Sequence, residues 1–222
     1  KKRYAEVVDF KEYENKIQKL LNTYVSSDEV IKINEPVNIF DKENFEKEVI
    51  KAVGEAAKAD MIAHRTKRTI EEKYEEDPVF YEKFSKLLKQ AIEDYRLARI
   101  TDAQYFLTAK NIMESVRNHE DSDVPEILRD QDAAKAFYGV IYESVGTKNS
   151  DKDVSAKIAI DVDAIIQRNI KVDWHLKPDV QNKMFNEIED YLADETKLGL
   201  NYDEIDLIME KVLNIAKRRY AQ

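Results

Sequence analysis

The sequence contains no cysteine, only four glycines and four prolines, and no long apolar run. The absence of cysteine excludes disulfides, thiolate nucleophiles and zinc sites built from thiolates. Sheets joined by tight turns need frequent glycine and proline, so their scarcity favours long helices with few turns. Because no apolar run approaches the roughly 18 residues that span a bilayer, and there is no signal peptide, we expect a cytoplasmic protein without a membrane partner.

Charged residues make up 36% of the 222 residues, and the net charge is −9. A chain of this length forms one large domain or two small ones, with a core of its own. The acidic balance argues against a protein that coats nucleic acid over its whole surface, but it permits a local basic patch. The chain begins with Lys1-Lys2-Arg3 rather than methionine, which predicts a fragment of a longer protein.

Apolar residues recur at intervals of three and four through most of the chain, which predicts helices. The clearest face is Phe80, Phe84, Leu87, Leu88, Ala91 and Tyr95. Asp41, Asp77-Pro78 and either Thr101 or Asp102 are suited to helix starts, and a stripe of Phe45, Val49 and Val53 follows the first of them. The fold class is therefore all-α, a bundle of about nine or ten helices in two lobes.

Breaks in this pattern predict the domain boundaries. Residues 25–40 contain Pro36 and read as a short irregular or strand-like arm, so 1–40 is expected to be a connecting arm. The polar stretch 146–153 is the best linker. It separates a main helical lobe at 41–146 from a C-terminal helical lobe at 147–222.

Residues for catalysis do not stand out. The four glycines lie far apart, so the chain builds no phosphate-binding loop. Asp60 and His64 can share a helix face and hold a metal, but a surface hydrogen bond is the simpler interpretation. Glu71-Glu72-Lys73 follows the order of acidic residues and lysine in metal-dependent nucleases, yet it lies on a predicted helix rather than a strand hairpin. We therefore predict no catalytic, cofactor-binding or metal-binding residue.

Two basic clusters and one tryptophan are candidate contact residues. Arg65, Lys67 and Arg68 lie on one predicted helix. They either pair with carboxylates one turn away, such as Glu72 beyond Arg68, or contact a partner or DNA phosphates.

The second cluster is Lys217-Arg218-Arg219 near the chain end, where Arg218 and Arg219 either favour a helix C-terminus or contact a partner. Trp174 lies in a turn between two predicted helices. It is either a core side chain that joins those helices or an exposed anchor for a partner.

Short strings spread over nearly the whole chain resemble the C-terminal region of the R (restriction) subunits of type I restriction–modification enzymes. They occur in the order of that family. The strings include Asp9-Phe10-x-x-Tyr13-Glu14, Asp28-Glu29-Val30-Ile31, Glu35-Pro36-Val37-Asn38-Ile39-Phe40-Asp41, His64-Arg65-Thr66-Lys67-Arg68-Thr69-Ile70, Glu75-Glu76-Asp77-Pro78, Met113-Glu114-x-Val116-Arg117-Asn118, Ala136-Phe137-Tyr138-Gly139-Val140, Asp179-Val180-Gln181-Asn182 and Ile188-Glu189-Asp190-Tyr191-Leu192.

The resemblance implies a parent subunit with a nuclease domain, two ATP-driven helicase-like motor domains and a C-terminal helical domain. The parent translocates and cuts DNA with ATP and Mg, whereas no cofactor is expected in this fragment. Its partners would be the modification and specificity subunits of the methyltransferase core and the upstream motor domains, to which residues 1–40 connect. The motifs of the nuclease and the motor lie upstream, so no catalytic residue is carried over to this chain.

Three functions follow as hypotheses. The first is a non-catalytic domain that docks the motor subunit on the methyltransferase core. The second is an element of the duplex-DNA path, in which Arg65, Lys67 and Arg68 contact phosphates. The third is a stand-alone enzyme, which the lack of a catalytic motif in the sequence disfavours.

Overall fold

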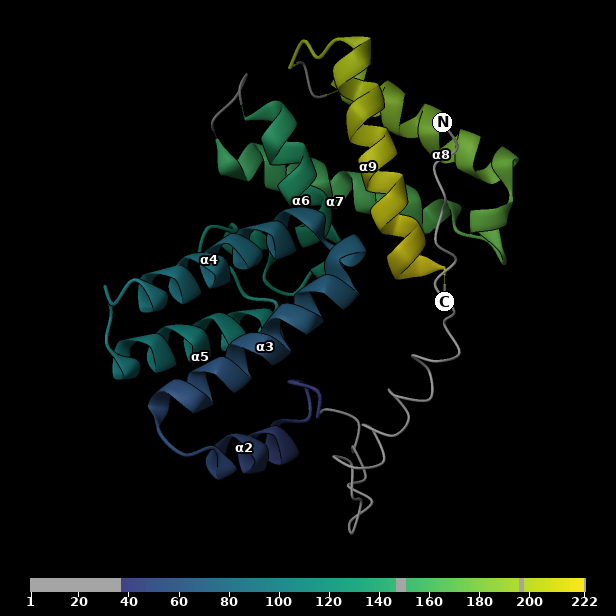
Figure 1. Ribbon diagram of the computed structural model, residues 1–222. Helices are drawn as coiled ribbons and strands as arrows, with labels where there is room; N and C mark the ends of the chain where they lie inside the picture. The colour runs from purple at the N-terminus through teal and green to yellow at the C-terminus, as the bar shows by residue number, and fades with distance from the viewer. Residues whose placement is uncertain (1–36, 147–150, 196–197, 222) are drawn as a thin grey trace, which may run out of the picture. The chain divides into compact units, whose positions relative to one another are not determined.

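The structure is a computed structural model that describes residues 37–146, 151–195 and 198–221 (Figure 1). Its helices are α2 (Lys42–Lys51), α3 (Glu55–Lys73), α4 (Pro78–Arg96), α5 (Asp102–Asn118), α6 (Asp132–Val145), α7 (Lys152–Asn169), α8 (Pro178–Asp190) and α9 (Tyr202–Tyr220). Short 3₁₀ turns occur at Tyr74–Glu76 (η1), Glu126–Leu128 (η2) and Trp174–Leu176 (η3), and a π-helical turn at Tyr191–Glu195 (η4).

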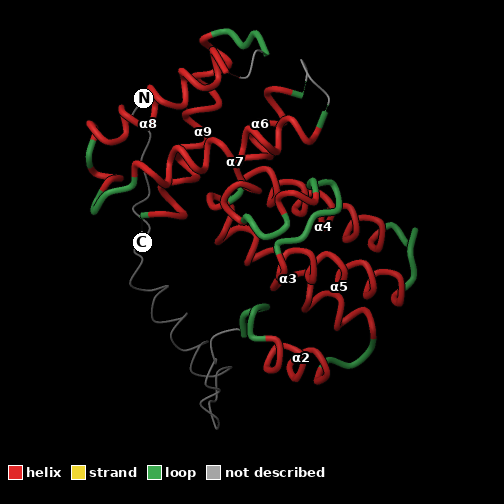
Figure 2. Tube along the Cα trace, turned by 180° about the vertical axis from the view of Figure 1, so that it is seen from behind, coloured by secondary structure: helices red, strands yellow, loops and turns green. Residues whose placement is uncertain are grey.

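The all-α prediction is confirmed, since the described residues form helices and loops without a strand (Figure 2). They contain eight α-helices, slightly fewer than the predicted nine or ten, and residues 1–36 lie outside the described part. The predicted strand-like arm also falls there, except for residues 37–40. These form a turn closed by a 3.1 Å hydrogen bond from the Asp41 N–H to the Asn38 carbonyl.

Side-chain caps determine where several helices begin. The Asp41 carboxylate accepts a 3.3 Å hydrogen bond from the first turn of α2. Asp77 does the same for α4 at 3.2 Å and directly precedes Pro78. Thr101 and Gln104 form a capping box at the start of α5. Since these caps satisfy N–H groups that have no partner within the helix, the three predicted helix starts are confirmed.

Helices α2 to α5 enclose the first of two apolar cores. α3 packs along α5 and against α4, and both views show the three side by side (Figures 1 and 2). Arg117 on α5 donates a 2.7 Å hydrogen bond from Nε to the Ile39 carbonyl, and its guanidinium lies 5.8 Å from the centre of the Phe45 ring. Arg117 thereby ties the turn before α2 to α5. Residues buried from α4 and α5 are Phe80, Tyr81, Phe84, Leu88, Ala91, Tyr105, Ala109, Ile112, Met113 and Val116.

Helices α6 to α9 enclose the second core, in which α6 packs on both α7 and α9. The largest side chain in this core is Trp174, from the η3 turn. The apolar side chains of α6 belong here, although the sequence places α6 in the main lobe with α2 to α5. The predicted boundary at 146/147 stays a prediction, but the change from one core to the other lies before α6.

The two cores meet where α4 approaches α6 and where α9 approaches η1. A Cβ atom on Gly139 of α6 would lie 2.8 Å from the Cβ of Val79 on α4. Only glycine therefore fits at this crossing without a shift of one helix. The close approach places Val79 and Val140 at the bottom of the groove described below.

Two predicted core positions are exposed. Val53 is 92% exposed because α2 ends at Lys51, and Gly54 then adopts a φ of +87° that starts a separate helix. Leu87 is 44% exposed because the neighbouring Leu88 occupies the buried face of α4. In both cases the spacing of apolar residues predicts burial at a position that no neighbouring helix covers.

Candidate functional site

The C-terminal end of α9 is attached to the turn between α3 and α4. Arg218 forms an ion pair with Glu75, and Arg219 donates a 2.8 Å hydrogen bond from Nε to the carbonyl of Glu76. Arg219 and Glu76 are 143 positions apart in the sequence. The C-terminal basic cluster lies in the last turn of α9, and Arg218 and Arg219 also link the second core to the first.

A partly buried hydrogen-bond network also holds the same end of α9. The Tyr220 hydroxyl donates a 2.6 Å hydrogen bond to Asp163 on α7, and burial and the Asp163 carboxylate raise the pKa of Tyr220 well above its usual range. The indole N–H of Trp174 donates a 3.3 Å hydrogen bond to the Tyr220 carbonyl. The last turn of α9 is therefore fixed in position.

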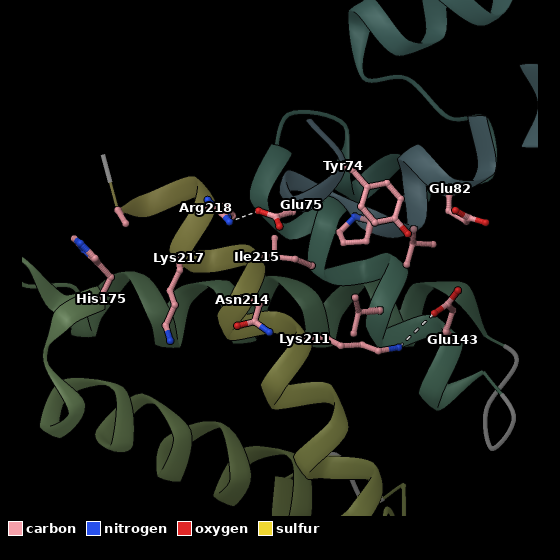
Figure 3. Close-up of a pocket in the computed structure, with 14 residues that line it drawn as sticks. Tyr74, Glu75, Glu82, Glu143, His175, Lys211, Asn214, Ile215, Lys217 and Arg218 are labelled. Atoms are coloured by element: carbon pink, nitrogen blue, oxygen red, sulfur yellow. Dashed lines mark ion pairs between the residues drawn. The ribbon is translucent and has the colours of Figure 1, made fainter. Parts of the chain in front are cut away.

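A groove of about 900 Å³ lies between α9 and the opposite elements η1, α4 and α6 (Figure 3). We call it the α9 groove. Val79, Val140 and Ile215 contribute its apolar lining. Val140 and Ile215 are 2% and 1% exposed, so the packed core holds the apolar floor of the groove in place.

The two walls of the α9 groove carry opposite charges. α9 contributes Lys211, Lys217 and Arg218, whereas the opposite wall contributes Glu75 from η1, Glu82 from α4 and Glu143 from α6. Two ion pairs cross the groove, as the dashed lines in Figure 3 show. Besides the Arg218–Glu75 pair, Lys211 Nζ lies 3.9 Å from a Glu143 carboxylate oxygen.

Both crossing ion pairs are accessible to water. The side chains of Arg218 and Glu75 are 61% and 64% exposed, and those of Lys211 and Glu143 are 43% and 55% exposed. Ion pairs exposed to this degree contribute about 1 kcal/mol or less to stability. The groove charges can therefore exchange these partners for others at small cost.

One end of the groove carries polar groups without such partners. Within the described ranges, the Lys217 ammonium and the Asn214 amide form neither an ion pair nor a side-chain hydrogen bond. His175 lines the same end, and Figure 3 shows it on the side of Lys217, away from both ion pairs.

Arg65, Lys67 and Arg68 of α3, called the α3 cations below, lie elsewhere, since none of them lines the α9 groove. Each has a carboxylate in range: Arg65 with Glu48 at 3.8 Å, Lys67 with Glu71 at 3.7 Å and Arg68 with Glu72 at 2.6 Å. The side chains of Lys67 and Arg68 are more than half exposed. The pairing one helical turn away that the spacing predicts is present for Lys67 and Arg68, whereas the partner of Arg65 lies on α2; contact with DNA stays a prediction.

Trp174 lies in the core with 2% of its surface exposed, so it is the side chain that joins α7, α8 and α9. Its neighbours in the same turn, Val172 and Leu176, are 79% and 71% exposed. Sequence reasoning singled out the tryptophan and missed these two aliphatic side chains. The sequence around Trp174 does not indicate that these two side chains are exposed, because their exposure depends on how the η3 turn packs against the core.

A second pairing joins α5 to α4. His119 ends α5 in a left-handed conformation with φ of +51°, and its Nε2 lies 3.0 Å from the carboxylate of the buried Asp77. Since Asp77 also caps α4, this His–Asp pair has a structural role.

No group of three or more histidine or acidic side chains in the part of the chain that the structure describes is placed to hold a metal ion. None of the helices described there has the length and hydropathy needed to cross a bilayer.

Comparisons with known proteins agree on one family. A family model described as "Type I restriction enzyme HindI endonuclease subunit-like, C-terminal" matches residues 1–222. A protein of Methanocaldococcus jannaschii, assigned as the MjaIXP endonuclease subunit of a type I restriction enzyme, is 25% identical over 216 residues. That match covers 94% of this chain and 20% of the relative, so the chain spans about a fifth of its length. The search of solved structures gave no match. The chain belongs to the family of C-terminal regions of HindI-like type I restriction enzyme endonuclease subunits.

Proposed function

We propose that this chain mediates assembly of a type I restriction endonuclease subunit with its methyltransferase core, made of modification and specificity subunits. The observation that carries the proposal is the match of all 222 residues to the C-terminal region of such a subunit. A subunit acts within a larger enzyme, and a helical domain at its end is suited to contacts with the other subunits.

The surface of the described helices supports this role. The α9 groove combines an apolar floor with exposed charges whose present ion pairs are weak. Interfaces that form reversibly have such an apolar centre with a polar rim. In this proposal the chain itself is non-catalytic and cytoplasmic, and the ATP- and Mg-dependent reactions belong to other parts of the parent subunit.

Contact with duplex DNA through the α3 cations is the second candidate. It is favoured by the exposure of Lys67 and Arg68, whose ion pairs one helical turn away are weak enough to yield to phosphates. However, Glu71 and Glu72 lie beside them and would repel a phosphate. Docking is therefore the function that we place first.

Size-exclusion chromatography with light scattering tests the docking role. The chain is mixed with the methyltransferase core of the same restriction–modification system, and circular dichroism establishes that it is helical. We expect a single peak with the summed mass of chain and core. Separate elution of a folded chain, even when the chain is in large excess over the core, would contradict the proposal.

A further inference from the structure

The opposite charges on the two walls of the α9 groove restrict the kind of partner that can bind there. One wall presents three cations, Lys211, Lys217 and Arg218, along one side of α9. The other wall presents three glutamates from three different elements, η1, α4 and α6. An apolar floor separates the two walls, so the groove is polarised across its width (Figure 3).

A strongly charged occupant of one sign does not fit this groove. An acidic segment would pair with α9 but would be repelled by Glu75, Glu82 and Glu143, and a phosphate group would meet the same repulsion. A basic segment would face the converse problem at α9. The complementary occupant has carboxylates along one flank, cations along the other and apolar side chains between them.

An amphipathic helix meets these requirements, because its flanks and its apolar stripe face different directions. The groove volume of about 900 Å³ accommodates the side chains of a few helical turns. On binding, the helix would replace the two crossing ion pairs with intermolecular pairs and would supply a carboxylate to Lys217, which has none in the described structure.

We infer that the α9 groove binds an amphipathic helix of a partner subunit, with the carboxylates of that helix against α9 and its cations against the glutamate wall. This inference rests on the proposed function, since the partner subunit belongs to the methyltransferase core. It adds the location of the docking surface, the secondary structure of the occupant and the orientation of its charged flanks.

Paired charge reversals on the two walls test the inference. Lys217→Glu changes a cation that has no ion pair to lose in the described residues, and Glu82→Lys changes an exposed carboxylate whose partner, Lys86, lies one turn away. If each wall contacts an opposite charge, both variants weaken binding of the chain to the methyltransferase core, each by about fivefold or more. Affinity is measured by isothermal titration calorimetry with the purified core.

The opposite signs of the two reversals distinguish specific docking from general attraction. If only the net charge mattered, one reversal would weaken binding and the other would strengthen it, and this result would overturn the inference. Matched controls are Lys89→Glu and Glu93→Lys, which make the same charge changes at exposed positions of α4 outside the groove. We expect less than a twofold change from either control.

A third variant blocks the groove without altering charge. Asn214 is exposed on α9, lines the groove and has no side-chain partner among the described residues, so Asn214→Trp should fill the groove and leave the fold intact. We expect binding to fall by about tenfold or more, with unchanged circular dichroism. Normal binding of this variant and of both wall variants would overturn the inference while leaving the docking function in place. Failure of the unaltered chain to bind the core would contradict the docking function itself.

Discussion

Replacement of Trp174 by alanine should destabilise the chain strongly. The indole is 2% exposed, packs in the second core and donates a hydrogen bond to the Tyr220 carbonyl at the end of α9. Removal of a buried tryptophan side chain costs about 3–5 kcal/mol, and the loss of the hydrogen bond adds about 1 kcal/mol. For a domain of this size, each 1 kcal/mol lowers Tm by roughly 2–4 °C, so a decrease on the order of 10 °C is expected.

Thermal and urea unfolding followed by circular dichroism at 222 nm measure this effect, since the far-ultraviolet signal of the helices does not depend on tryptophan. Trp174→Phe is the graded comparison, because it keeps an aromatic ring and loses only the hydrogen bond and part of the volume. Its cost should be about half that of the alanine variant. Leu107→Ala, at an exposed position of α5, is the control and should leave Tm within about 2 °C of the unaltered chain.

The result that would refute this reasoning is a stable Trp174→Ala variant that no longer binds the methyltransferase core. Such a variant would mean that Trp174 is an exposed partner anchor in solution. A large loss of stability, by contrast, identifies the residue as the side chain that holds α7, α8 and α9 together.

Further predictions concern an acid-sensitive ion pair, a helix cap and the α3 cations. The hydrogen bond from Lys83 lowers the pKa of Asp123. The pair therefore stabilises the fold at pH values above the ordinary aspartate pKa of about 3.9, and this stabilisation is lost as the pH falls through the lowered pKa of Asp123. Lys83→Met should therefore reduce the loss in free energy of unfolding between about pH 6 and pH 3, measured with urea. Asp77→Ala should lower the free energy of unfolding by about 1–2 kcal/mol, because α4 loses its cap and His119 loses its carboxylate, whereas Asp77→Asn should retain most of the cap. Neutralising all three α3 cations to glutamine should leave binding to duplex DNA unchanged, and a decrease of about 3 in the slope of log K against log salt would instead support the DNA-path function.

Local features of the fold could be read from the sequence. Asp77 directly before Pro78, and Thr101 three residues before Gln104, act within one helical turn, so the sequence alone contains the capping groups. The same holds for the apolar face of α5, because all of its members lie on one helix. The burial of Trp174 was one of two alternatives that the sequence allowed, and packing decided between them.

The α9 groove could not be read from the sequence, because it joins distant residues. Glu75 and Arg218 face each other only after α9 has packed on η1, and the sequence around neither residue predicts that the two will pair. The close approach of α4 and α6 depends on Gly139, which the sequence shows only as an isolated glycine in a helical run. The sequence shows Arg218 and Arg219 as a basic cluster, but their partners, and the groove that Arg218 borders, required the tertiary structure.

Competition for the methyltransferase core tests the assembly function most directly. The complete endonuclease subunit, carrying a fluorescent label, is bound to the core, and the unlabelled 222-residue chain is added in increasing amounts. The account predicts that the chain displaces the labelled subunit, and that the Asn214→Trp variant displaces it only at about tenfold higher concentration or not at all. No displacement by the folded chain, even in large excess, would contradict the claim that this region holds the subunit on the core.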